Sequence, residues 1–178
     1  PQILIGNSLG GLTAVRMAGL KPEQTLALVL ISPGGSPIGQ AELEELLGRF
    51  KMDGHADSSA FVDAFLGGST HVRPDLVWAV RARVQRPSVK LLIESISSAP
   101  MLAPEELSEL AMPIQLYWGQ DDDILGAEHL AFYRAHLPAQ TEVLTPQGQG
   151  HAPFLEDLDG FLAPVLDFCR RLDQRPPG

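Results

Sequence analysis

The sequence predicts an α/β fold in which a parallel sheet carries an inserted group of helices. Continuous apolar runs, the longest of them from 26 to 31, are typical of parallel strands buried on both faces. Between 36 and 110 these runs give way to apolar residues at helical spacing. We therefore expect a core formed by residues 1–35 and 111–178, and a helical cap over 36–110.

The first element is an apolar strand over Gln2 to Ile5, and an apolar helix follows over Leu9 to Leu20. Between them lies Gly-Asn-Ser-Leu-Gly, with Ser8 at its centre. A serine in this position occupies a sharp, strained turn that exposes its Oγ, and glycines two residues on either side leave room for the turn. Ser8 is thus the candidate nucleophile, and the N–H of Leu9 at the helix N-terminus is a candidate oxyanion donor. The alternative is a glycine-rich turn without a catalytic role.

The second strand, 25–31, ends in the breaker-rich segment Ser-Pro-Gly-Gly-Ser-Pro, and four apolar stripes follow it. Each stripe predicts one amphipathic helix of the cap. The stripes are Leu43, Leu46, Leu47 and Phe50; Phe61, Val62, Phe65 and Leu66; Leu76, Val77 and Val80; and Val89, Leu92, Ile93 and Ile96. Such stripes more often pack helix against helix than contact substrate. The candidates to line an apolar acyl pocket are Phe61, Phe65, Trp78 and Met101.

Three carboxylates, Asp121, Asp122 and Asp123, follow an apolar run from 114 to 118 that predicts a buried strand. One carboxylate at a strand end can fix the tautomer of a catalytic histidine and stabilise its imidazolium form. The competing interpretation is a solvated turn that caps the next helix. These residues alone do not choose among the three aspartates.

His151 stands in a glycine-flanked loop after the apolar run 141–144, and it follows the serine and the aspartates along the chain. That order fits a general base, whereas most isolated loop histidines are simply solvated. The last helix is expected over Asp159 to Leu172, with Pro164 in its first turn or at a kink. Its predicted buried residues are Leu162, Val165, Cys169 and Leu172.

These motifs together resemble the α/β-hydrolase superfamily, from Pro1 to about Leu172. The resemblance implies a Ser8, aspartate and His151 triad, and the family's acid turn, counted from Gly119, selects Asp122. It also implies a serine hydrolase of the carboxylesterase type that cleaves an ester-like bond of a neutral, partly hydrophobic acyl substrate through an acyl-enzyme. The segment Gly-Asn-Ser-x-Gly-Gly looks like carbon–carbon bond hydrolases of aromatic degradation, whereas His-Ala-Pro-Phe-Leu-Glu looks like esterases acting on acyl methyl esters. The same triad would serve either reaction.

The chain departs from the family pattern at its start, because Pro1 lies only a few residues before the nucleophile. The strands that precede the elbow in the family are absent, and no His-Gly dipeptide marks a second oxyanion donor. We therefore expect the C-terminal portion of the fold, starting at the elbow, with poor activity in isolation and self-association through the exposed strand 2–5. The competing class of function is a non-catalytic interaction module.

Composition excludes several partners. The formal net charge of −9 and the scattered basic residues argue against nucleic acid and anionic membranes. No dinucleotide or Walker motif is present, so no cofactor is expected. No metal site is expected either, because His55, His71, His129 and His136 lack metal-ligand spacing and are interpreted as solvated residues. The apolar runs are too short to cross a bilayer, and we expect a cytoplasmic protein acting on a small-molecule ester or acyl substrate.

Overall fold

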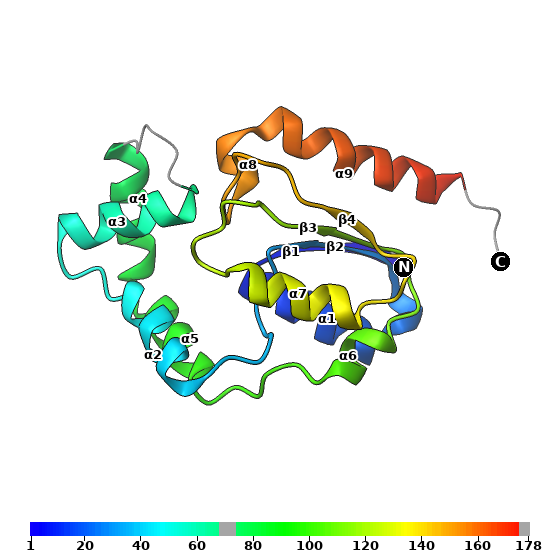
Figure 1. Cartoon of the computed structure of the whole chain (residues 1–178), viewed down its shortest axis with the longest axis horizontal. Coiled ribbons are helices and arrows are strands. Elements are labelled where there is room, and N and C mark those ends of the chain that lie inside the picture. The colour runs from blue at the N-terminus through cyan, green and yellow to red at the C-terminus, as the bar shows by residue number, and fades with distance from the viewer. Residues whose placement is uncertain (68–73, 175–178) are drawn as a thin grey trace.

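The computed structural model describes residues 1–67 and 74–174. Its sheet is four-stranded and entirely parallel, in the order β1-β2-β3-β4 (Figure 1). The strands are β1 (Gln2–Asn7), β2 (Thr25–Ile31), β3 (Ile114–Tyr117) and β4 (Glu142–Leu144). The α/β fold class with a parallel sheet is therefore confirmed. Because all four strands run in one direction, the loops that carry the candidate site residues all emerge at the carboxyl-terminal ends of the strands.

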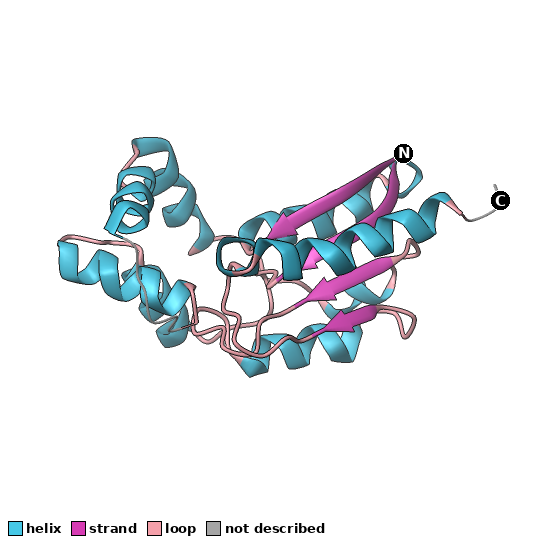
Figure 2. Cartoon of the chain, turned by 90° about the horizontal axis from the view of Figure 1, so that it is seen from above, coloured by secondary structure: helices cyan, strands magenta, loops and turns pink. Residues whose placement is uncertain are grey.

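Helices cover both faces of this sheet (Figures 1 and 2). One face carries α1, α6 and α7, and the other carries α9. The helix bounds are α1 (Leu9–Leu20), α2 (Gln40–Arg49), α3 (His55–Phe65), α4 (Pro74–Val84), α5 (Pro87–Ile96), α6 (Pro104–Ser108), α7 (Ala127–His136), α8 (Pro153–Glu156) and α9 (Leu158–Asp173), with a short 3-10 helix at Pro22–Gln24.

Strand β2 lies between β1 and β3 and is buried on both faces. Leu28 and Leu30 point into the cluster shared with α1 and α7, whereas Ala27, Val29 and Ile31 pack into the cluster formed with α9. This two-sided burial accounts for the continuous apolar run, since alternate side chains of a strand face opposite sides.

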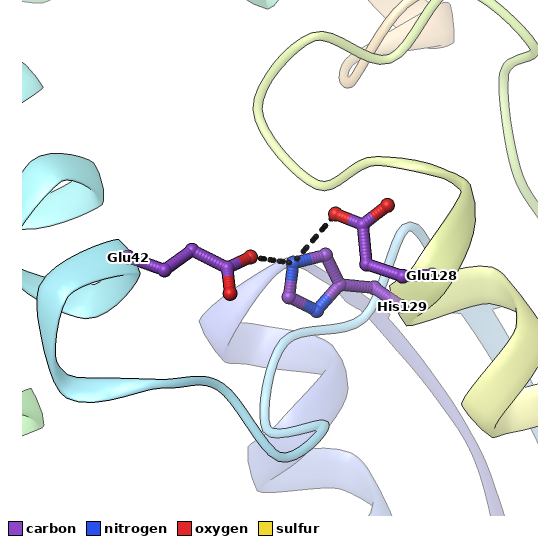
Figure 3. A group of neighbouring side chains, drawn as sticks. All are labelled: Glu42, Glu128 and His129. Atoms are coloured by element: carbon purple, nitrogen blue, oxygen red, sulfur yellow. Dashed lines mark ion pairs between the residues drawn. The ribbon is translucent and has the colours of Figure 1, made fainter.

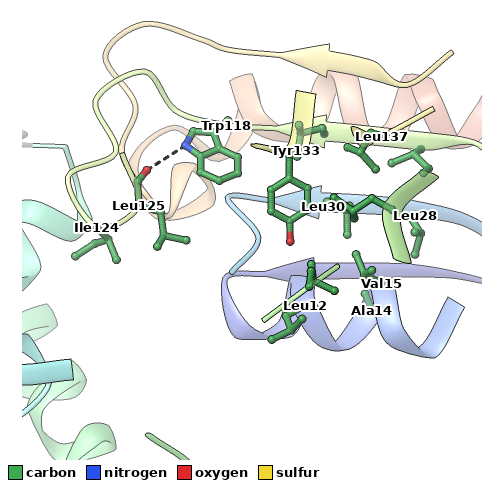
Figure 4. Packing of buried hydrophobic residues seen from close by; sticks show 14 of the residues in the cluster. Leu12, Ala14, Val15, Leu28, Leu30, Trp118, Ile124, Leu125, Tyr133 and Leu137 are labelled. Carbon is green, nitrogen blue, oxygen red and sulfur yellow. Dashed lines mark hydrogen bonds between the residues drawn. The ribbon is translucent and has the colours of Figure 1, made fainter. Parts of the chain in front are cut away.

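Two aromatic residues tie the loops at the strand ends to the core beneath them (Figure 4). The indole of Trp118 donates a hydrogen bond to the carbonyl oxygen of Leu125 at 3.3 Å, which holds the loop after β3. The hydroxyl of Tyr133 on α7 donates to the carbonyl oxygen of Gly34 at 2.6 Å, which holds the loop after β2. Both aromatic rings are fully buried, so the core fixes the two loops that flank the serine turn.

The last helix differs from its prediction in one respect. It begins at Leu158, so Pro164 lies inside the helix rather than in its first turn. The carbonyl oxygen of Pro164 accepts a hydrogen bond from Gln115 of β3 at 3.2 Å. Val165 and Leu172 are buried as expected, and Leu162 and Cys169 are partly buried, but the largest buried side chains of this helix are Phe161 and Phe168.

Helices α2 to α5 lie beyond the end of the sheet toward which the strand arrowheads point (Figure 2). They form at the four predicted apolar stripes. Helix α6 instead packs on α1, where Glu106 pairs with Arg16 at 3.2 Å. The division into a core and a cap over 36–110 remains a prediction. Within the described residues, no helix is both long and apolar enough to cross a membrane.

Strand β1 forms one edge of the described sheet, and Ile5 on this strand is 56% exposed. Because an uncovered edge strand offers unpaired backbone groups, we expect this chain to self-associate through β1. Light scattering should detect oligomers, and Ile5→Lys should reduce them, whereas Leu158→Lys at the exposed start of α9 should not. Stable monomers of the unsubstituted chain would contradict this expectation.

Candidate active site

Ser8 occupies a strained turn between β1 and α1. Its φ of 53° and ψ of −121° are rare for a residue with a side chain. Two backbone hydrogen bonds hold it there: its N–H donates to Ile31 O at 3.0 Å, and its carbonyl oxygen accepts from Gly34 N at 2.9 Å. The end of β2 and the loop after it therefore enforce the conformation that exposes the serine.

The glycines around Ser8 have different functions. A Cβ atom on Gly6 would lie 2.3 Å from the carbonyl oxygen of Gly10, and one on Gly11 would lie 2.6 Å from the Cβ of Pro33, so both positions require glycine. A Cβ on Gly10 would meet nothing within 4 Å, so the expectation that Gly10 leaves room for the turn is wrong. Leu9 is the first residue of α1, where the N–H has no acceptor within the helix.

His151 and Asp122 form a buried pair. The Nδ1 of His151 lies 2.8 Å from Oδ2 of Asp122, and both side chains are 1% exposed. The other carboxylate oxygen, Oδ1, accepts the backbone N–H groups of Ile124 and Leu125, each at 2.9 Å. The carboxylate is thus fixed from three directions and orients the imidazole ring.

The neighbouring aspartates are placed differently. The carboxylate of Asp121 accepts the N–H of Gly148 at 2.8 Å, whereas Asp123 is exposed and its carbonyl oxygen accepts a hydrogen bond from Arg49. Of the three carboxylates, only that of Asp122 reaches His151 in the described structure.

Close backbone contacts bring the acid and histidine loops together. A Cβ on Gly119 would lie 2.2 Å from Gln149 O, and one on Gly150 would lie 2.2 Å from Gly67 N at the end of α3. Glu156 accepts the N–H of Gly150 at 2.9 Å. Burial raises the pKa of Glu156, and this hydrogen bond lowers it in part. Close packing therefore requires glycine both at position 150, beside His151, and at position 119 in the acid loop.

Asn7 connects the histidine loop to the serine turn. Its side-chain amide donates to the carbonyl oxygen of His151 at 2.9 Å and to that of Ile31 at 3.1 Å. The structure therefore places the Asp122 and His151 pair beside the turn that carries Ser8. Among the described residues, no hydrogen bond joins Ser8 Oγ to His151. Catalytic hydrogen bonds are often long without substrate and shorten when it binds.

The pKa of the Asp122 carboxyl is lowered. Burial alone raises it, but the hydrogen bond and charge of His151, together with the N–H of Leu125, outweigh burial. A carboxyl with a lowered pKa contributes stability that is complete above its unfolded pKa of about 3.9 and is lost as the pH falls through the folded value.

We therefore expect the free energy of unfolding of the protein to fall more steeply below about pH 4 than that of Asp122→Asn, which has no such proton to take up. Urea titrations at a series of pH values measure this slope, and exposed Asp123→Asn is the matched control. Equal slopes for the protein and Asp122→Asn would show that the pair does not contribute in this way.

An apolar pocket of about 80 Å³ opens beside Ser8. Met101, one of the four candidate lining residues, contributes to its wall. Phe61 is buried between Phe50 and Phe65, and Phe65 packs edge-on against the ring of His151 at a centroid distance of 5.2 Å. Trp78 is 74% exposed and does not line this pocket.

Most of the pocket wall was not predicted. It comes from the stripe on α2 and from residues beside it, namely Ile38, Leu43, Leu46, Leu47, Phe50, Ile96, Ile124, Leu125 and His129. The α2 stripe was visible in the sequence but was assigned to helix packing. Its position directly after the loop from β2 is the signal that could have identified it as pocket wall.

Two of the four remaining histidines are not solvated cap or helix residues. His129 is only 4% exposed, on α7 rather than in the cap, and its Nδ1 lies 2.5 Å from Ser36 Oγ. His136 is partly buried, with Nδ1 2.8 Å from Phe132 O. His55 is exposed at the start of α3, as expected, and His71 lies outside the described residues.

The model of the family described as "Alpha/beta hydrolase family" matches residues 1–163. The chain belongs to the alpha/beta hydrolase family. This match covers β1 to β4 and the loops that carry Ser8, Asp122 and His151.

Two groups of relatives are similar over nearly the whole chain. A pimeloyl-[acyl-carrier protein] methyl ester esterase of Yersinia enterocolitica is 29% identical, over 95% of this chain and 69% of the esterase. A 2-hydroxy-6-oxo-6-phenylhexa-2,4-dienoate hydrolase of Comamonas testosteroni is 24% identical, over 94% of this chain and 62% of that enzyme. The chain thus spans about two thirds of the length of these relatives.

A solved structure agrees in fold. The 2-hydroxy-6-oxo-6-phenylhexa-2,4-dienoate hydrolase from Rhodococcus sp. strain RHA1 superposes with a TM-score of 0.77 at 19% identity, over 93% of this chain and 63% of that chain. At this identity the likeness establishes the fold alone.

Proposed function

We propose that this protein is a serine hydrolase that cleaves an ester-like bond of a neutral, partly hydrophobic acyl substrate through an acyl-enzyme. The observation that carries the proposal is the buried pair of Asp122 and His151, tied by Asn7 to the strained turn of Ser8. A carboxylate, an oriented imidazole and an exposed hydroxyl are the three groups that nucleophilic acyl transfer requires.

The hydrogen bond to Asp122 determines how His151 acts. Because a carboxylate only accepts, Nδ1 of the ring carries the proton and Nε2 is left with a free lone pair. In the proposed reaction Nε2 takes the proton of the Ser8 hydroxyl as Oγ attacks the carbonyl carbon. The N–H of Leu9 then donates to the resulting oxyanion, and the helix N-terminus adds favourable electrostatics.

The tetrahedral intermediate collapses when the protonated Nε2 of His151 gives its proton to the leaving alcohol. The acyl group then remains on Ser8 Oγ. Nε2 next takes a proton from water, whose oxygen attacks the acyl carbonyl, and a second collapse returns the proton to Oγ and releases the acid. Asp122 stabilises the imidazolium form in both halves of the cycle.

The apolar pocket supports a neutral acyl group. Its wall beside Ser8 is formed mainly by aliphatic and aromatic side chains, so a carboxylate buried there would lose its hydration without a charged partner. The name of the Yersinia relative specifies a methyl ester of an acyl chain, which is consistent with an ester substrate.

We therefore expect kcat/KM for p-nitrophenyl esters of medium-length neutral acyl chains to exceed that for half-esters of dicarboxylic acids of equal length by about tenfold or more. Ser8→Ala provides the background rate for both substrates. A preference for the charged half-ester would contradict the apolar pocket. Turnover no higher than that of Ser8→Ala with any ester or ketone substrate would favour the non-catalytic interaction module.

A carbon–carbon bond hydrolase is the second candidate, because relatives named as 2-hydroxy-6-oxo-dienoate hydrolases match the same span of chain. The same three residues would then act on a ketone. Comparing turnover of such a dienoate with turnover of a neutral ester, in the same preparation, distinguishes the two substrate classes.

A further inference from the structure

A cluster outside the proposed catalytic residues joins α2 to α7 (Figure 3). It consists of Glu42 on α2 and of Glu128 and His129 in the first turn of α7. The two carboxylates are exposed, whereas the imidazole is 95% buried with its Nε2 directed at both of them. The potential ligand atoms of the three residues all lie within 4.8 Å of one another.

The distances in this cluster are those of ligands around a common ion rather than those of strong hydrogen bonds. Nε2 of His129 lies 3.4 Å from Glu42 and 3.6 Å from Glu128. A charge-assisted N–H···O bond is about 2.7 to 2.9 Å long. Zinc–nitrogen and zinc–oxygen bonds of about 2.0 to 2.2 Å in a tetrahedral site place neighbouring ligand atoms about 3.3 to 3.6 Å apart. Both distances therefore fit two edges of a zinc site.

The orientation of the imidazole also fits a ligand. Nδ1 of His129 is hydrogen-bonded to Ser36 Oγ at 2.5 Å. Nε2 of the same ring forms no hydrogen bond among the described residues. A partner on the second ring nitrogen fixes the tautomer and orientation of a metal-binding histidine. When Nδ1 carries the proton, the Nε2 lone pair faces two negative carboxylates, and a cation placed between the three groups would relieve that repulsion.

The backbone at Gly126 leaves room for the carboxylate of Glu128, the third potential ligand. A Cβ on Gly126 would lie 2.8 Å from both carboxylate oxygens of Glu128, so glycine at this position lets the carboxylate fold back toward His129. The cluster was not visible in the sequence, because Glu42 lies far from the other two residues along the chain and is brought to them only by the docking of α2.

We propose that Glu42, Glu128 and Nε2 of His129 bind a divalent cation of the zinc type, which fastens α2 to the core. Two carboxylates and a neutral imidazole balance the charge of the ion, and their exposed side leaves a fourth position for water. Because α2 and His129 both line the pocket beside Ser8, the ion would stabilise the pocket wall without taking part in the reaction. The inference is independent of the proposed esterase activity.

Calorimetric titration of the metal-free protein with zinc chloride at neutral pH tests the proposal. We expect one zinc ion per chain, with affinity reduced about tenfold to a hundredfold or more in Glu42→Gln and in Glu128→Gln. Glu44→Gln, which changes an exposed carboxylate on the same helix, is the matched control and should bind zinc normally. Zinc should also raise the Tm of the protein and of the control, but not that of the two cluster variants.

Absence of zinc binding, or equal binding by the protein and all three variants, would overturn the proposal. So would a Tm of the protein that does not respond to zinc. Glu42 and Glu128 are exposed, so their glutamine variants are expected to fold.

Discussion

Asp122→Asn should lower kcat by about 10⁴-fold while leaving the fold intact. The amide can offer its NH₂ group to Nδ1 of His151, which stabilises the tautomer with the proton on Nε2. In that tautomer the ring cannot accept the proton of Ser8. The hydrogen bond between Nδ1 of His151 and Oδ2 of Asp122 is 2.8 Å long and fully buried, so solvent cannot substitute for the lost carboxylate. Steady-state ester hydrolysis with circular dichroism as a control for folding measures the effect.

The neighbouring aspartates are matched controls for this experiment. Asp121→Asn removes a hydrogen bond to Gly148, and Asp123→Asn changes an exposed side chain, so both should cost far less activity. If Asp121→Asn lowers activity most among the three variants, the triad acid is Asp121 and the assignment to Asp122 is wrong.

His151→Ala should have a larger effect on turnover than Asp122→Asn, a loss of about 10⁶-fold, because the general base of both half-reactions disappears. Residues of a triad act as a unit, so the double variant with Ser8→Ala should be no slower than either single variant. His136→Asn is a suitable control, since this histidine is partly buried and hydrogen-bonded but lies on α7, away from the aspartate. A double variant much slower than both single variants would indicate that the two residues act separately.

The elements that frame the site could be predicted from local patterns. The strand over 25–31 forms as expected, because a continuous apolar run is typical of a buried parallel strand. The helix over 9–20 also forms as expected, because it is an apolar stretch that directly follows a glycine-containing turn. Asp122, which the family resemblance selected by counting from Gly119, is the aspartate whose carboxylate reaches His151 in the described structure. These features depend on residues close together in the sequence.

Features that depend on tertiary contacts could not be predicted in the same way. The apolar stripe on α2 is compatible with both helix packing and a pocket wall, and only its docking beside Ser8 decides between them. Similarly, nothing near His129 in the sequence indicates that Ser36 and Glu42 surround it. Pro164 was expected in the first turn of the last helix or at a kink, and it lies inside α9, which begins at Leu158 with Asp157 accepting Gly160 N at 3.0 Å.

The central claim is that Ser8 is the nucleophile, and covalent labelling with a fluorophosphonate tests it most directly. The probe reacts with an activated serine hydroxyl, so peptide mapping should locate the label on Ser8, and Ser8→Ala should abolish both labelling and ester turnover. Ser95→Ala, which changes an exposed serine on α5, is the control and should still be labelled. Undiminished labelling or turnover in purified Ser8→Ala would contradict the account.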